Sequence, residues 1–111
     1  MSRGKPFQCE MFVSSWVEEK LLIKHGIEVW EIEEIIYDDP HAFSKKYRDC
    51  YFVYGQTFSG RYLLVLVRVL GKQEVHKLGY NHNMNFLKVI TARDMNRKQR
   101  REYIARKGTK S

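Results

Sequence analysis

The chain has 111 residues, of which 43% are hydrophobic and 14% aromatic, and this composition excludes a disordered protein. Its length predicts a single domain, 1–111, with a loose leader at 1–6 and a loose tail at 108–111. The formal net charge is +7, and residues 97–111 alone contain seven lysines and arginines and one acidic residue. Residues 14–39, in contrast, contain eight acidic residues and two lysines. Because the positive charge is concentrated at the C-terminal end, we expect that end to bind phosphates.

The sequence contains no sign of export or of a membrane segment. Its longest apolar run, 62–67, is too short to span a bilayer, and the N-terminus lacks the apolar part of a signal peptide. The two cysteines, Cys9 and Cys50, do not have a metal-binding spacing. They favour a reduced, cytoplasmic protein, and a disulfide between them is the alternative. No cluster of aspartate and glutamate has a metal-binding spacing either, and no cofactor is expected.

The first predicted elements are a short strand and a helix. Residues 8–13 predict the strand. Ser15 and Glu18 have the spacing of a capping box, in which each side chain accepts a hydrogen bond from a free amide at a helix start. The helix is expected to run to His25, with Gly26 as its C-terminal cap.

A second helix is predicted over 27–37. Val29, Ile32 and Ile36 fall on one face of it, as expected for a helix that packs on a core. The helix should end before Pro40, because proline disfavours helical geometry at the residue that precedes it.

Three strands are predicted next. Residues 47–56 and 61–70 form a hairpin around a turn at 57–60, and 61–70 is apolar on both faces, which is typical of a covered central strand. The polar segment 72–84 predicts a long hairpin arm or a loop. Residues 86–91 predict a third antiparallel strand.

A basic helix is predicted to end the chain. Asn96 and Gln99 have the spacing of a capping box for a helix over 97–107. The element order is β-α-α-β-β-β-α. It predicts an α+β fold with two N-terminal helices, an antiparallel sheet of three to four strands and a basic C-terminal helix.

Several short segments, in order along the chain, resemble one known family. They are Lys24-His25-Gly26-Ile27, Asp39-Pro40, Tyr54-Gly55-Gln56-Thr57 with Gly60-Arg61, Val89-Ile90-Thr91-Ala92-Arg93-Asp94-Met95, and Arg100-Arg101-Glu102-Tyr103. This ordered set resembles the BrnT-type toxins of bacterial toxin–antitoxin pairs, which are small ribonucleases with a RelE-like fold. The resemblance implies a RelE-like fold, endoribonuclease activity and, as the partner, a cognate antitoxin of the DNA-binding kind that is common in such pairs.

Two features depart from the family pattern. The family usually has an arginine where this chain has Cys50. Arg48 lies two residues earlier, and on a strand this spacing keeps one face, so Arg48 is expected to substitute for that arginine. The segment 73–85 is also longer than the usual arm of the family.

Metal-independent RNA cleavage needs a base, an acid and cations that stabilise the phosphate. Arg93 is the first candidate for the phosphate clamp, because it lies at a strand end before a helix and its planar fork binds two oxygens. The alternative is an ion pair with an acidic residue of the first two helices or with Asp94. Arg61 and Arg48 are further candidate phosphate contacts, although Arg61 is also explained as an exposed hairpin residue.

His25 is the candidate general acid or base, because histidine changes charge near neutral pH. Alternatively, it ends a helix and interacts with free carbonyls. Glu31, Glu33 and Glu34 could supply a carboxylate base, but a run of glutamates on a helix is typical of a solvated face.

The basic helix supplies the predicted RNA-binding residues Arg97, Arg100, Arg101 and Tyr103. Tyr103 could stack on a base or pack the last helix on the core. The helix could also dock on an antitoxin or simply be solvated.

The leading functional hypothesis is a toxin that acts as a metal-independent endoribonuclease, with RNA and an antitoxin as partners and no membrane. A non-catalytic nucleic-acid or antitoxin-binding module and an inactive toxin descendant are the alternatives.

Overall fold

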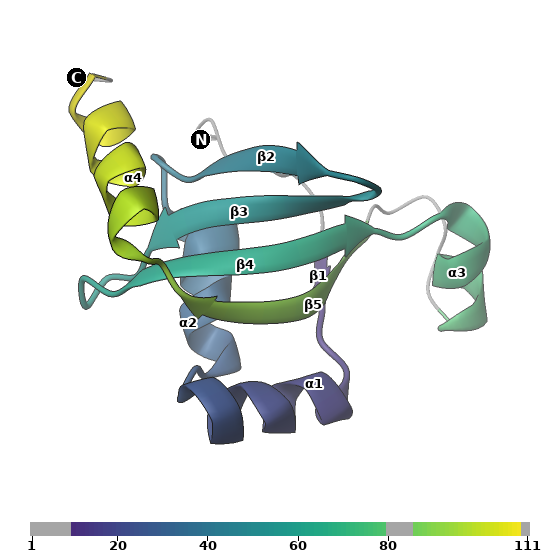
Figure 1. Cartoon of the computed structure of the whole chain (residues 1–111). Coiled ribbons are helices and arrows are strands. Elements are labelled where there is room, and N and C mark those ends of the chain that lie inside the picture. The colour runs from purple at the N-terminus through teal and green to yellow at the C-terminus, as the bar shows by residue number, and fades with distance from the viewer. Residues whose placement is uncertain (1–9, 80–85, 110–111) are drawn as a thin grey trace.

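A five-stranded sheet organises the fold, and the computed structural model describes residues 10–79 and 86–109 of the chain (Figure 1). The strands are β1 (Glu10–Phe12), β2 (Phe43–Tyr47), β3 (Cys50–Gln56), β4 (Tyr62–Val69) and β5 (Phe86–Asp94). Their order across the sheet is β1-β5-β4-β3-β2. β1 runs parallel to β5, and all other neighbouring strands are antiparallel.

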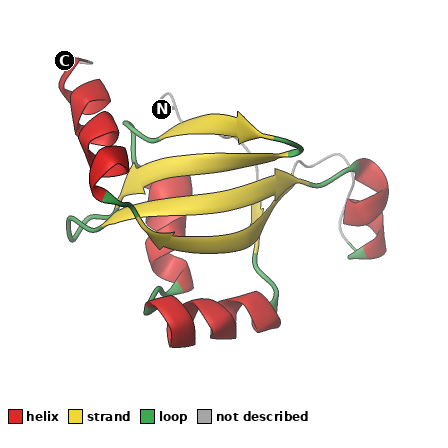
Figure 2. Cartoon of the chain, viewed as in Figure 1, coloured by secondary structure: helices red, strands yellow, loops and turns green. Residues whose placement is uncertain are grey.

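Helices lie against one face and at both ends of this sheet (Figure 2). They are α1 (Ser15–Lys20) with its π-helical continuation η1 (Leu21–His25), α2 (Val29–Glu33) with its π-helical continuation η2 (Glu34–Asp38), α3 (Lys72–Lys77) and α4 (Arg97–Thr109). α1 and α2 lie on one side of the sheet, whereas α4 and α3 stand at opposite ends (Figure 1). The predicted α+β class is confirmed.

The predicted antiparallel sheet of three to four strands is wrong in the number and order of its strands. The sequence analysis missed β2, an edge strand that includes Ser44, Lys45 and Lys46 and therefore looks like a loop. Edge strands tolerate such polar residues because only one of their sides pairs. β1 joins the sheet in parallel through pairs such as Glu10 with Phe86, a contact between distant residues that no local pattern encodes.

The predicted loop at 72–84 is wrong over its first half, where α3 forms. The Glu74 carboxylate accepts hydrogen bonds from the Gly71 amide at 3.0 Å and from the Arg68 guanidinium at 2.7 and 3.0 Å. The Arg68 bonds lower the pKa of Glu74 to about 2. Val75 is buried and fastens the helix to the end of the sheet. The end of the predicted segment lies outside the described residues, as do Cys9 and the leader.

The predicted start of the first helix is wrong by one residue. Ser14, rather than Ser15, is the N-terminal cap, and its hydroxyl accepts a hydrogen bond from the Val17 amide at 3.2 Å. The predicted end is confirmed, because Gly26 has a φ of +61°, a left-handed conformation that glycine adopts without strain.

The start of α4 follows the prediction. The backbone N–H of Asn96 donates to Gln99 Oε1 at 2.9 Å, and the backbone N–H of Gln99 donates to Asn96 Oδ1 at 2.8 Å. This reciprocal pair is the predicted capping box. The helix continues to Thr109, so the expected loose tail at 108–111 is wrong for its first residues.

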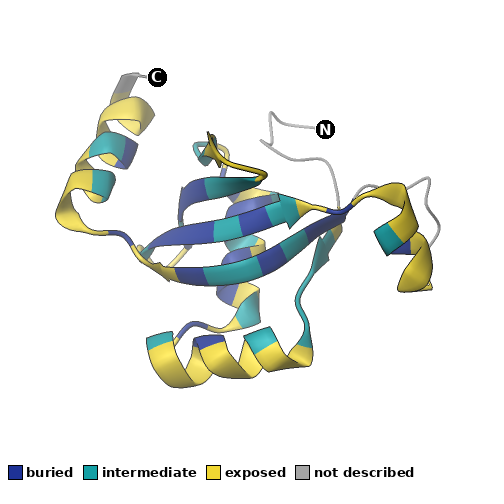
Figure 3. Cartoon of the chain, turned by 45° about the vertical axis from the view of Figure 1, so that its right-hand side comes forward, coloured by how far each residue is buried: buried dark blue, intermediate teal, exposed yellow. Residues whose placement is uncertain are grey.

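The main core lies between the sheet and the helical segments α1, η1, α2 and η2. Figure 3 shows many buried residues, in dark blue, along β4 and β5. β4 is the central strand, as predicted, and its Leu63, Val65 and Val67 are fully buried in this core. η2 packs directly on β3 at Gly55, where a Cβ atom would overlap Ile35. The missing side chain at this position therefore sets the spacing between helix and sheet.

We expect Gly55→Ala to destabilise the protein by about 1–3 kcal/mol, because the added methyl group has no space beside Ile35. Urea unfolding followed by circular dichroism measures this. Gly108→Ala is the matched control, since a Cβ atom there has no neighbour within 4 Å. Equal stability of the two variants would contradict the close approach.

Candidate functional site

The guanidinium of Arg61 lies at the centre of the corner where β4 begins and β5 ends. Its Nε and Nη2 donate to the Asp94 carboxylate at 2.9 and 3.2 Å. Its Nη1 donates to Glu31 Oε1 at 3.1 Å and to the Gly26 carbonyl at 2.9 Å. Its Nη2 also donates to the His25 carbonyl at 3.0 Å. One side chain therefore joins the end of η1, helix α2 and strand β5.

These contacts change the titration of both partners in the main ion pair. The hydrogen bond to Asp94 is the largest cause of a raised pKa for Arg61. The same bond lowers the pKa of Asp94, with a smaller effect from the nearby charge of His25. Arg61, a predicted phosphate contact, is thus placed in an internal network rather than on the exposed hairpin. Glu31 is buried there, so its predicted solvated position is wrong.

The imidazole of His25 lies close enough to Asp94 to influence its charge. It is partly exposed and makes no hydrogen bond to any residue that the structure describes. Its backbone carbonyl is already taken by Arg61. The side chain is therefore accessible to solvent at the edge of the Arg61 network.

Arg93 precedes Asp94 on β5 but lies on the other side of the sheet edge. Arg93 pairs with Leu64 across the sheet, and Asp94 pairs with Leu63. Leu64 and Leu63 belong to separate hydrophobic clusters, one on each face of the sheet. Arg93 Nη1 donates to the Asp94 carbonyl at 3.0 Å and is 3.4 Å from Gln99 Oε1. Among the described residues no carboxylate pairs with it, so the alternative ion pair is not formed.

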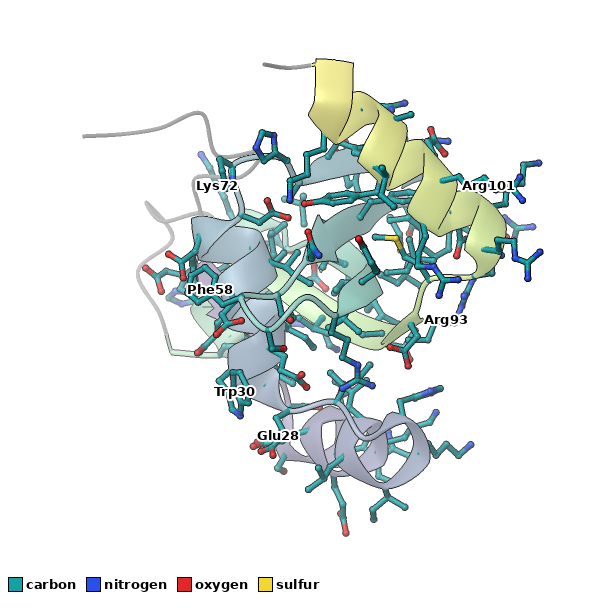
Figure 4. The ribbon with its side chains drawn as sticks, turned by 90° about the vertical axis from the view of Figure 1, so that its left-hand side faces the viewer. Glu28, Trp30, Phe58, Lys72, Arg93 and Arg101 are labelled. Carbon is teal, nitrogen blue, oxygen red and sulfur yellow. The ribbon has the colours of Figure 1, made fainter. Side chains whose placement is uncertain are left out.

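The first turns of α4 extend this unpaired positive charge. Arg97, Lys98, Arg100 and Arg101 are exposed and form no ion pair within the described chain. Figure 4 shows Arg93 and Arg101 on the same side of the domain. We call these five residues, Arg93 included, the basic surface.

Some cations elsewhere are neutralised by carboxylates. Lys45 lies 2.7 Å from Glu102, and Arg106 lies 3.2 Å from the same residue. Arg68 is paired with Glu74. Lys46 and Arg48 also form no ion pair within the described chain, so the basic surface is distinguished by having five such cations between Arg93 and Arg101.

Arg48 is not on a strand, so its predicted position on the same strand face as Cys50 is wrong. It lies in the two-residue turn between β2 and β3, where Tyr47 pairs with Cys50, and has a φ of +59°. Its guanidinium is 5.4 Å from the centre of the Tyr47 ring. The turn is at the opposite end of β3 from Arg61, about 20 Å away at about 3.3 Å per residue.

Tyr103 is 1% exposed, so its ring is covered in this structure. Its hydroxyl donates to Asp39 Oδ2 at 2.7 Å, and burial, with this hydrogen bond, raises the pKa of Tyr103. The Asp39 carboxylate also accepts hydrogen bonds from the backbone N–H groups of Gln56 and His41, each at 2.9 Å. The alternative prediction, that Tyr103 packs the last helix, describes its position.

Asp39 was missed as a central residue, and only the Asp39-Pro40 segment of the family resemblance indicated it.

Two further searches were negative for the described residues. No group of three histidine, cysteine, aspartate or glutamate side chains there could hold a metal ion. No helix in that part of the chain has the length and apolar content needed to cross a membrane.

We expect Tyr103→Phe to destabilise the protein by about 1–3 kcal/mol, because the buried Asp39 carboxylate loses a hydrogen bond. Tyr47→Phe, at an exposed ring, is the control and should change stability little. Urea unfolding measures both. An unchanged midpoint for Tyr103→Phe would show that the bond does not stabilise the fold.

The ion pair of Arg61 with Asp94 predicts a pH dependence. Because the pKa of Asp94 is lowered in the folded chain, the pair stabilises the fold above the ordinary aspartate pKa of about 3.9. This contribution is lost as pH falls through the lowered value. The difference in unfolding free energy between wild type and Asp94→Asn should therefore shrink in acid. Asp38→Asn, at an exposed residue, is the control. A difference in unfolding free energy that does not change with pH, or one that is equally large for Asp38→Asn, would contradict this.

The sequence was also compared with known proteins. It matches no family model, and a search of curated proteins found no significantly similar sequence. The likeness to BrnT-type toxins therefore stays a hypothesis that these comparisons do not support.

Proposed function

We propose that this chain is a metal-independent endoribonuclease with a RelE-like fold and serves as the toxin of a toxin–antitoxin pair. The observation that carries the proposal is the basic surface, whose exposed cations lack carboxylate partners among the described residues. Such a surface gains free energy from an RNA backbone by releasing its condensed counterions.

In this proposal Arg93 binds the scissile phosphate. Its guanidinium has donors in a planar fork that fits two phosphate oxygens, and no described carboxylate competes for them. It would stabilise the charge that develops when the 2′-oxygen attacks phosphorus and the bond to the 5′-oxygen breaks. Arg97, Arg100 and Arg101 hold the neighbouring phosphates.

His25 is the proposed base. It lies beside Asp94, on the other side of the sheet edge from Arg93, so the proposal requires the RNA backbone to cross the end of β5. Its imidazole takes the proton of the 2′-hydroxyl, the 5′-oxygen is protonated from solvent, and the products are a 2′,3′-cyclic phosphate and a 5′-hydroxyl. Arg61 acts in this scheme as a positioning residue. It holds the His25 carbonyl and the Asp94 carboxylate, and thereby fixes His25 relative to the end of β5.

A binding module without catalysis, or an inactive toxin descendant, is the second candidate. Two observations favour it: Arg61 is engaged by carboxylates and carbonyls, and Arg48 lies at the other end of β3. Three of the four predicted catalytic residues, Arg61, His25 and Arg48, thus do not belong to the basic surface. RNA or an antitoxin would then bind α4 without cleavage.

We expect the purified chain to cleave RNA in excess chelator, and Arg93→Ala to lower the rate by about 10²–10³. Arg93→Lys should retain part of the activity, because the charge stays and the fork is lost. Lys46→Ala removes an exposed cation from edge strand β2 and should leave the rate unchanged. Detection of 2′,3′-cyclic phosphate ends identifies the reaction.

Cleavage by wild type and Arg93→Ala alike would remove Arg93 from the mechanism. If RNA stays intact in every sample, also with ribosomes present, the non-catalytic binding module or inactive descendant is the reading that remains. If the chain only binds RNA, the triple variant Arg97→Gln/Arg100→Gln/Arg101→Gln should bind RNA more weakly. The slope of the logarithm of the binding constant against the logarithm of salt concentration should become less steep by about 0.7 for each phosphate contact removed.

A further inference from the structure

A second surface combines exposed aromatic rings with acidic residues. Trp30 on α2 is 50% exposed, and Phe58 at the tip of the β3–β4 hairpin is 73% exposed. The Phe58 amide donates to Glu34 Oε1 at 2.9 Å, which holds the hairpin tip against the helix. Glu33 and Glu34 lie three and four residues after Trp30, so they flank its ring. We call these residues, with Glu28, the acidic aromatic surface.

The outer face of α4 has the opposite composition. Arg97, Arg100, Arg101 and Ile104 follow a spacing of three, four and seven residues and therefore share one helix face. Ile104 is 50% exposed, although it is a large apolar residue. We call this face the basic stripe. Each surface thus has an apolar part bordered by charges, and the charges are of opposite sign.

The two surfaces cannot meet within one copy. Figure 4 shows Glu28, Trp30 and Phe58 along one side of the domain and Arg93 and Arg101 on the opposite side. Neither the Glu28 and Glu33 carboxylates nor the arginines of the stripe form an ion pair with any described residue. Both surfaces are therefore available to another molecule.

We propose that the acidic aromatic surface of one copy binds the basic stripe of a second copy, head to tail. Arginine guanidiniums of the stripe would stack on the Trp30 and Phe58 rings, a favourable cation–π contact. Ile104 would cover the rings, and Glu33 would pair with the arginines. The net charge of +7 opposes association at long range, so the contact depends on these local pairs and weakens with salt.

This arrangement is heterologous, so each copy keeps one unused surface and association continues beyond a dimer. A docked copy covers Arg100 and Arg101, which makes self-association and RNA binding compete. The inference does not depend on RNA cleavage, because the association is measured on the protein alone.

Sedimentation velocity of the full chain tests the proposal with two defective variants. Trp30→Ala/Glu33→Gln removes the acidic aromatic surface, and Arg100→Gln/Arg101→Gln removes the basic stripe. All the changed side chains are exposed, and circular dichroism checks the fold. Neutral replacements are used so that no new complementary charges arise.

At about 0.05 M salt the wild-type mass should rise with concentration past twice that of one chain, and at about 0.5 M it should return to that of one chain. Each variant alone should stay monomeric. An equimolar mixture should stop at a dimer, since only one intact surface of each kind remains. Monomeric wild type, association of either variant alone, or a mixture that stays monomeric would overturn the proposal.

Discussion

The Arg61 guanidinium is the interaction on which the arrangement of this domain depends. Through this one group it joins the end of η1, helix α2 and strand β5. Glu31 is buried beside it, and a buried carboxylate is tolerated when a cation and further hydrogen bonds compensate its charge. The helical layer is thereby tied to the sheet at the edge where His25 and Arg93 lie.

A second polar network performs the same task for α4. The Asp39 carboxylate receives the Tyr103 hydroxyl and the Gln56 amide, so it connects the end of η2 to β3 and to the last helix. Tyr103 is held inward, whereas Arg100, Arg101 and Ile104, which lie to one side of it around the helix, are exposed. This hydrogen bond and the packing of Tyr103 on Tyr54 and Leu64 thus fix which side of α4 faces the sheet.

Local patterns predicted those elements whose signals involve neighbouring residues. The Asn96 and Gln99 capping box, the Gly26 helix end and the apolar central strand depend on contacts within a few positions, and the structure contains all three. β2 and the parallel position of β1 were missed, because pairing with a distant strand decides them. α3 was missed because the Arg68 bonds to Glu74 support a polar segment that has little apolar periodicity.

The sequence by itself determined where the positive charge lies along the chain and that the fold is α+β, and it named the arginines that are candidates for phosphate contact. Only the tertiary structure decided which of these arginines are neutralised. Arg61 and Arg93 are equally charged, but Arg61 meets Asp94 and Glu31 while Arg93 meets only neutral oxygens among the described residues. The physical reason is that the charge of a side chain is a local property, whereas its compensation depends on partners that folding brings from 30 or more positions away.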